Sequence, residues 1–196
     1  MRRLLAVAAL LLCGCSSVRM VDSQVWSMST LPEGTATLAG AHYRFERLPS
    51  QADQPRFDRV QAIAEAALAR VGLVRDDAGA QYSVLLGSTV QPYVVDPWGG
   101  PTGSGYGTVM IGAGSGGYGS MFGFGMSMPA PTSYRREVSV VMRDLRTGQV
   151  VYETRASNEA PWADTDNVLR PMFEAALQDF PHPPPGVRQI HIEIPR

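Results

Sequence analysis

Residues 134–156 read YRREVSVVMRDLRTGQVVYETRA, and this stretch decides the fold. In its first part, residues 134–145, apolar side chains alternate with polar ones at Val138, Val140 and Met142. Arg146-Thr147-Gly148 is a short turn containing glycine, and Val150–Ala156 returns with a second strand pattern. Alternation on both sides of a short turn is typical of a β-hairpin with one buried face.

Four further segments have the composition or alternation of strands: Gln24–Thr30, His42–Leu48, Tyr82–Val90 and Gln189–Ile194. In the last of these, Ile190, Ile192 and Ile194 alternate with His191 and Glu193. Strands of this kind bury one face and leave the other polar, which favours an antiparallel or mixed sheet covered on one side.

Two segments have the period of amphipathic helices. In Pro55–Val71, apolar residues recur every three or four positions, Pro55 suits the first turn, Asp53 is a candidate cap and Gly72 supplies the stop. The second helix is predicted from about Thr165 to Asp179, with Asp164 or Thr165 as its cap. Its buried stripe is formed by Leu169, Met172, Phe173, Ala176 and Phe180.

The order of predicted elements is β-β-α-β-β-β-α-β. This order predicts an α+β fold, a two-layer sandwich with a mostly antiparallel or mixed sheet and two helices on one face. One domain over residues 23–196 accounts for the length. A long Gly-rich loop at 97–127 interrupts that domain.

The Gly-rich insert at 97–127 holds 12 of the 20 glycines. It carries the aromatic residues Tyr106, Tyr118, Phe122 and Phe124. An insert of this length is usually functional or disordered. One interpretation is a flexible loop; the other is an adaptable surface for a partner or for the membrane interface, because aromatic and methionine side chains are typical contact residues.

The N-terminus has the pattern of a secretory signal peptide. Met1-Arg2-Arg3 is followed by an apolar run, Leu4–Leu12, that is too short to cross a membrane as a helix. The only two cysteines, Cys13 and Cys15, follow it. A disulfide across one residue would be strained, and a metal site would need further ligands nearby.

Leu12-Cys13-Gly14-Cys15 resembles the bacterial lipobox. The resemblance implies a signal peptide over residues 1–14 and cleavage after Gly14. Cys15 then carries diacylglycerol and usually an amide-linked acyl chain such as palmitate, and residues 15–22 form a lipidated tether. Two or more chains hold a protein stably on a membrane. Ser16 and Ser17 differ from the Asp that resembles an inner-membrane retention signal, so the resemblance favours the periplasmic face of the outer membrane.

The net charge and the absence of catalytic motifs argue against several classes of function. The formal net charge is −1, and the basic residues are all arginines spread along the chain, which argues against nucleic-acid binding. Gly112–Gly117 matches G-x-G-x-x-G, but no helix pattern follows it, so no nucleotide cofactor is predicted. The three histidines, His42, His182 and His191, show no catalytic or metal-binding setting, and we expect neither an enzyme nor a metal site.

Several segments in order resemble a known family. They are HYRFERL, LARVGLVRDD, AQYSVLL, VSVVMRDLRTGQVVYETRAS and ALQDFP, and the match covers roughly residues 22–182. They resemble bacterial lipoproteins that carry domain of unknown function 4136. The family often has Trp in place of Tyr152 and usually Asp in place of Gln81. The resemblance implies an envelope lipoprotein and supplies no activity or site.

We therefore predict a lipid-anchored cell-envelope protein of non-enzymatic type, an interaction or assembly module facing the periplasm. It would be attached to the membrane through acylated Cys15 and would contact an envelope protein. The candidate contact residues are Tyr106, Tyr118, Phe122 and Phe124. The alternative is a periplasmic binding domain for a lipid or small apolar ligand, held between sheet and helices or under the Gly-rich loop.

Overall fold

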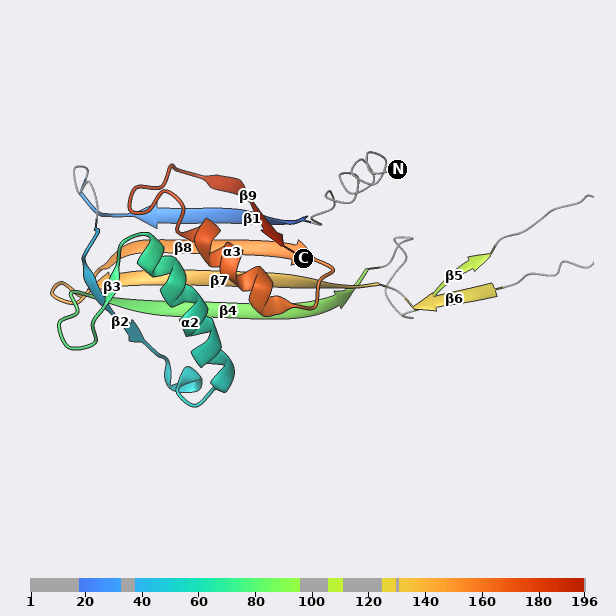
Figure 1. Cartoon of the computed structure of the whole chain (residues 1–196), viewed down its shortest axis with the longest axis horizontal. Helices are drawn as coiled ribbons and strands as arrows, with labels where there is room; N and C mark the ends of the chain where they lie inside the picture. Colours follow the sequence, from blue (N-terminus) through green and yellow to red (C-terminus); the bar gives the residue numbers. More distant parts are fainter. Residues whose placement is uncertain (1–17, 33–37, 96–105, 111–124, 130, 196) are drawn as a thin grey trace, which may run out of the picture.

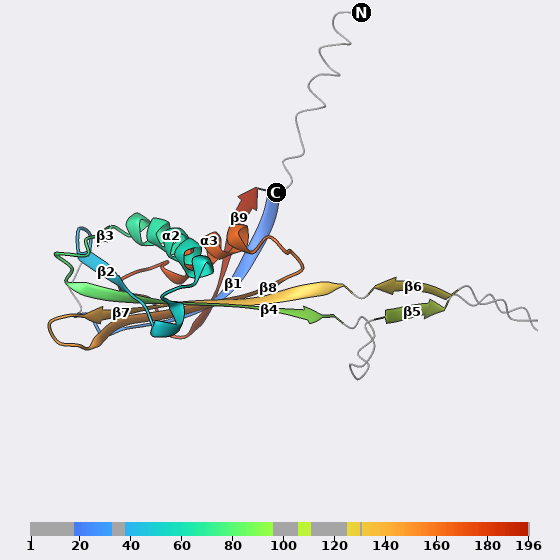
Figure 2. The same ribbon diagram turned by 90° about the horizontal axis from the view of Figure 1, so that it is seen from below.

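The structure is a computed structural model that describes residues 18–32, 38–95, 106–110, 125–129 and 131–195. Two helices lie side by side on one face of a broad sheet, and the other face carries no helix of the described chain (Figures 1 and 2). This confirms the predicted α+β arrangement with both helices on one face.

The large sheet is mixed and has seven strands in the order β3-β2-β4-β7-β8-β1-β9. Its strands are β1 (Val18–Ser29), β2 (His42–Glu46), β3 (Val74–Arg75), β4 (Tyr82–Val94), β7 (Thr132–Asp144), β8 (Val150–Ala160) and β9 (Val187–Pro195). β2 is parallel to β3 and β4, and the other neighbours are antiparallel. The hairpin predicted at 134–156 is β7 and β8 at the centre of this sheet.

Both predicted helices are present, α2 (Pro55–Arg70) and α3 (Thr165–Ala176), and a single 3₁₀ turn, η1 (Pro49–Gln51), precedes α2. Asp53 does not cap α2, because the N-cap is Gln54. Gly72 follows the end of α2 with φ of +89°, the left-handed conformation that favours glycine. Asp164 is the N-cap of α3, but its side chain makes no capping hydrogen bond, and α3 ends three residues before Asp179.

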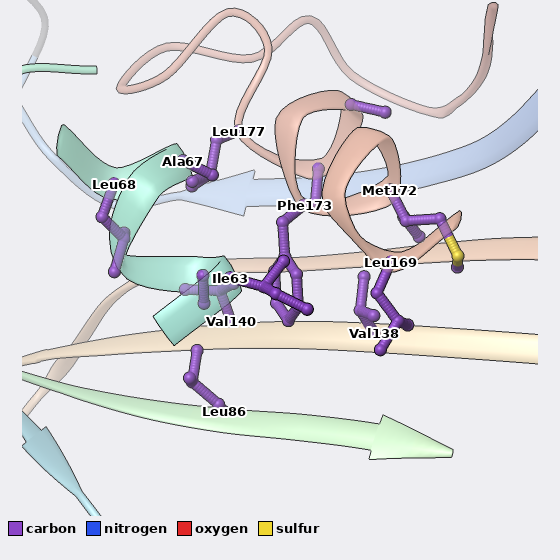
Figure 3. Close-up of a cluster of buried hydrophobic side chains, with 14 of the residues drawn as sticks. Ile63, Ala67, Leu68, Leu86, Val138, Val140, Leu169, Met172, Phe173 and Leu177 are labelled. Atoms are coloured by element: carbon purple, nitrogen blue, oxygen red, sulfur yellow. The ribbon is translucent and has the colours of Figure 1, made fainter. Parts of the chain in front are cut away.

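The core lies between the helices and the covered face of the sheet (Figure 3). Ile63 and Leu68 of α2 and Phe173 of α3 point toward Leu86 and Val140 of the strands, and all five are buried. The two helices are joined at both ends by ion pairs, Arg59 with Asp166 and Arg70 with Glu174. Burial of these apolar side chains is the main stabilising term for the domain.

Two regions differ from the sequence-based expectation. β1 begins at Val18, so most of the tether expected at residues 15–22 is part of the sheet. Within the insert, β5 (Tyr106–Met110) and β6 (Gly125–Pro129) pair as an antiparallel two-stranded ladder that is separate from the large sheet. Glycines between the apolar residues conceal these two strands, which the sequence predicts as loop.

Candidate functional site

The two segments that the sequence singles out leave the large sheet at the same end. Gln24 of β1, Ser157 of β8, Glu137 of β7 and Thr89 of β4 are paired in one row across the sheet. On one side of this row lie the first residue of β1, Val18, the last residues of β4 and the first residues of β7. The insert connects β4 to β7 on that same side. We call this edge, where β1 begins and the insert departs, the Val18 end.

The predicted site residues belong to the two segments of the sequence that adjoin the Val18 end. Cys15 precedes β1 by three positions and lies outside the described residues. Tyr106 opens β5, where its backbone pairs with Pro129. Tyr118, Phe122 and Phe124 lie outside the described residues. Figures 1 and 2 both place β5 and β6 beyond the ends of β4 and β7, so this ladder extends the sheet outward.

Apolar side chains are exposed on the uncovered face of β1 and β9. Val18 and Met20 are 48% and 43% exposed at the Val18 end. Toward the opposite end, Trp26 and Met28 are also exposed, and Trp26 pairs directly with Val187 of β9, which is 70% exposed. These side chains alternate with the buried residues of β1, so the strand pattern places them all on the face opposite to the helices.

The same face carries charged pairs between its apolar ends. His191 Nδ1 lies 2.6 Å from Asp22 Oδ1 across the β1–β9 pair. Arg155 Nε lies 3.4 Å from Glu137 Oε1 across the β7–β8 pair. His191 and Glu193 point away from the core as predicted. The middle of the uncovered face is therefore polar.

A buried arginine, which the sequence analysis missed, holds α3 to the Val18 end. Arg136 of β7 is fully buried, and its Nη2 donates to the Trp162 carbonyl oxygen. Its Nε and Nη2 each lie 3.4 Å from Thr165 Oγ1, and its guanidinium lies 5.0 Å from the Tyr134 ring centroid. Arg136 has the same strand parity as Val138 and Val140, and this parity was the available signal for its burial.

A second arginine secures the same loop. Arg19 of β1 donates two hydrogen bonds to the Asp164 carboxylate, at 2.8 and 2.7 Å, and its guanidinium lies 5.2 Å from the Trp162 ring centroid. These hydrogen bonds hold the pKa of Asp164 below its ordinary value. Burial lowers the pKa of Arg136, and the negative charge of Asp164 opposes that shift. The pairing explains Asp164 as a structural residue.

Several buried polar atoms beside this cluster have no hydrogen-bond partner: Arg136 Nη1, Asn158 Oδ1, Ser23 Oγ and Arg19 Nε. Arg136 and Asn158 are directly paired across β7 and β8. Donor and acceptor atoms close together in a buried setting are typical positions for an internal water molecule. The cluster therefore fits a structural network that fastens β1, β7, β8 and the start of α3.

His42 and Asp76 form a local structural pair. His42 Nδ1 lies 2.8 Å from Asp76 Oδ2. Backbone hydrogen bonds from Gly79 and Ala78, together with His42, lower the pKa of Asp76. Among the residues that the structure describes, no group of three or more His, Cys, Asp or Glu could hold a metal ion. In that part of the chain no helix is long and apolar enough to cross a membrane.

Hollows on the described surface have linings of mixed polar and apolar character. One of about 440 Å³ lies between the first turns of α2 and α3, lined by Pro55, Arg56, Arg59, Val90, Thr165 and Asp166. Another of about 460 Å³ lies near the ends of the same helices, beside Val71, Glu174 and Phe180. Between helices and sheet, where an apolar ligand was the alternative expectation, Figure 3 shows packed side chains.

Comparison with known proteins identifies a family and a fold. A family model described as "Domain of unknown function (DUF4136)" matches residues 33–182. No curated protein matches the chain. A PDZ domain protein from Parabacteroides distasonis ATCC 8503 is similar in structure, with a TM-score of 0.51 and 13% identity, over 98% of this chain and 42% of that one. This chain thus spans less than half of that protein, and the likeness concerns the fold alone.

Two structures of the PelC dodecamer from Paraburkholderia phytofirmans are also similar, one of them a variant with a single substitution. Their TM-scores are 0.43 and 0.45, at 12% and 11% identity, over 79% of this chain and 94% of each PelC chain. At this level of similarity they say nothing further about the present chain.

Proposed function

The chain belongs to the DUF4136 family, and from that premise we propose that it is a lipid-anchored protein of the cell envelope, a non-enzymatic interaction module on the periplasmic face of the outer membrane. The observation that carries the proposal is the position of Cys15. This cysteine ends a lipobox-like sequence, and only Ser16 and Ser17 separate it from the start of the sheet at Val18.

The short spacing supports an anchor rather than a free N-terminal tail. A fully extended chain spans at most about 3.6 Å per residue, so Val18 lies within about 11 Å of Cys15. The polar headgroup region of a bilayer leaflet is about 5–8 Å thick. An acylated Cys15 would therefore hold the Val18 end, with its exposed Val18 and Met20, directly at the membrane surface.

The uncovered sheet face supports the interaction part of the proposal. Trp26, Met28 and Val187 lie on this face away from the Val18 end, so they would face the periplasm in an anchored protein. Aromatic and methionine side chains are enriched where proteins contact one another, and tryptophan is common among the residues that dominate binding. An envelope protein is the partner that this position would meet.

Substitution of the two cysteines tests the anchor. In cells labelled with radioactive palmitate, we expect Cys15→Ser to lose the label and to remain unprocessed or enter the soluble periplasmic fraction. Cys13→Ser is the matched control, because Cys13 would leave with the signal peptide, and it should keep the label. Undiminished labelling of Cys15→Ser would refute lipid anchoring at this position.

Cross-linking in cells tests the interaction. A photoreactive amino acid at Trp26 should capture one discrete envelope protein, identified by mass spectrometry. The same amino acid at Arg146, in the turn between β7 and β8, is the control for non-specific capture. Equal capture from both positions, or none from Trp26, would contradict a protein-contact role for this face.

A further inference from the structure

The insert departs from the Val18 end as a β-arm. We define the arm as β5 and β6 together with the last residues of β4 and the first of β7. The β4–β7 ladder continues to the pair Val94 and Thr132, and Val95 N–H still donates to the Pro131 carbonyl at 3.0 Å. β5 and β6 begin shortly after, with Tyr106 paired to Pro129. The arm therefore points away from the helices and the core (Figures 1 and 2).

The last charged side chains before the arm lie where it joins the large sheet, which we call its root. Arg135 Nε lies 2.6 Å from Glu159 Oε1, and Tyr93 Oη donates to Glu159 Oε2 at 3.0 Å. Beyond this root, no Asp, Glu, Arg, Lys or His occurs between Asp96 and Arg135 in the sequence. This is the longest uncharged run in the sequence, and the next longest, residues 78–95, includes β4 of the large sheet.

The pairing of β5 with β6 provides backbone partners without charged side chains. Val109 pairs with Met126 and Gly107 with Met128. The ladder satisfies the backbone N–H and C=O groups that the two strands turn toward each other, but those on its two outer edges still need water. The arm therefore suits the hydrated headgroup layer and not the hydrocarbon core. Five paired residues extend about 17 Å, enough to pass through a headgroup layer.

Because the arm and Cys15 leave the sheet at the same end, we propose that the arm lies in the interfacial region of the membrane that holds the acylated Cys15. The arm contacts a lipid surface. Its uncharged sequence and the aromatic residue Tyr106 at its base suit the boundary of the headgroup layer. This proposal rests on the proposed lipid anchor. It gives the protein a second membrane contact, independent of the acyl chains.

A fluorescent label on the arm tests this contact. The full chain with Ser127→Cys would be produced in a bacterium that acylates lipoproteins, labelled with an NBD maleimide and placed in phosphatidylethanolamine–phosphatidylglycerol vesicles. The Arg146→Cys protein, labelled at the opposite end of the sheet, is the control. We expect blue-shifted emission at position 127 and quenching by doxyl-labelled lipids, and neither effect at position 146.

The anchor is checked in the same samples. An acylated Cys15 has no free thiol, so the protein without an added cysteine should take up no label and should show the mass of the lipid adduct. Uptake of label by that protein means that the anchor proposal fails. A lipid adduct together with equal, water-like emission at positions 127 and 146 means that the membrane contact of the arm alone fails.

A charged substitution separates lipid from protein as the occupant. Val109→Asp should abolish the blue shift at position 127 and leave the lipid adduct in place. Label at position 127 that is exposed on vesicles but shielded in native envelopes would overturn the proposal, because the arm would then be covered by a protein.

Discussion

Arg136 is a charged residue that is fully buried in the fold. A fully buried guanidinium loses its hydration, and no carboxylate lies within ion-pair distance of it among the described residues. Its nearest compensation is the charge of Asp164, which Arg19 already neutralises through two hydrogen bonds. Arg136 is therefore held mainly by neutral groups: its Nη2 donates to the Trp162 carbonyl oxygen, and its guanidinium lies near Thr165 Oγ1 and the Tyr134 ring.

Replacing Arg136 with residues of different volume tests this account. We expect Arg136→Ala to lower the free energy of unfolding by about 2–4 kcal/mol, because it leaves a cavity and an unpartnered carbonyl. Arg136→Met fills much of the same space and removes a costly buried charge but leaves the same carbonyl without a donor, so we expect a smaller loss, about 1–2 kcal/mol. Urea unfolding followed by circular dichroism measures both. Equal losses would mean that the charge itself stabilises the fold.

Acid should weaken the ion pair between Arg19 and Asp164. Hydrogen bonds from Arg19 lower the pKa of Asp164 in the folded chain. A carboxyl group whose folded pKa is depressed stabilises the protein above its unfolded pKa, near 4, and loses that contribution as the pH falls through the folded value.

We therefore expect the melting temperature to fall below about pH 4, and Asp164→Asn to have a lower melting temperature at pH 7 with a shallower acid decline. Asp53→Asn, at an exposed position outside the helices, is the control in calorimetry. An acid decline in Asp164→Asn as steep as in the parent would assign the effect to other carboxylates.

Elements whose side chains pack in one simple pattern could be predicted from the sequence. β7, β8, β9 and both helices follow the period of their apolar residues, because burial on one face selects that period. Strand parity signals the burial of Arg136, but its partner Trp162 could not be predicted. The pairing of Arg19, near the start of β1, with Asp164 could not be predicted either, because the two residues are 145 positions apart. A charged residue is read as exposed unless its partner is known.

We expect the core not to require the arm. β5 and β6 pair with each other and form a sheet separate from the large one. We expect that replacing residues 96–130 with Asn-Gly, which closes a two-residue hairpin, leaves a single cooperative thermal transition. The midpoint should move by only a few degrees. Circular dichroism measures this, and a broad, non-cooperative melt would show that the arm supports the core.

At the scale of the whole molecule, the distribution of charge favours one orientation on the membrane for a protein anchored as proposed. If the sheet lay flat, its uncovered face would press the Asp22–His191 and Arg155–Glu137 pairs against the lipid. Desolvating such groups is costly. If the sheet stands on its Val18 end, these pairs stay in water, and the start of β1 and the arm lie nearer the bilayer than the β7–β8 turn does. The second orientation also leaves Trp26 and Val187 free for a partner.

Energy transfer to the membrane distinguishes the two orientations. β7 has 13 residues from Thr132 to Asp144, so its ends are about 40 Å apart. With acceptor dyes on lipid headgroups, a donor on Thr132→Cys should transfer energy strongly, and a donor on Arg146→Cys weakly, because an upright sheet holds the β7–β8 turn far from the bilayer. Similar transfer from both positions would show a flat sheet, and the charged pairs of the uncovered face would then have to lie within the headgroup layer.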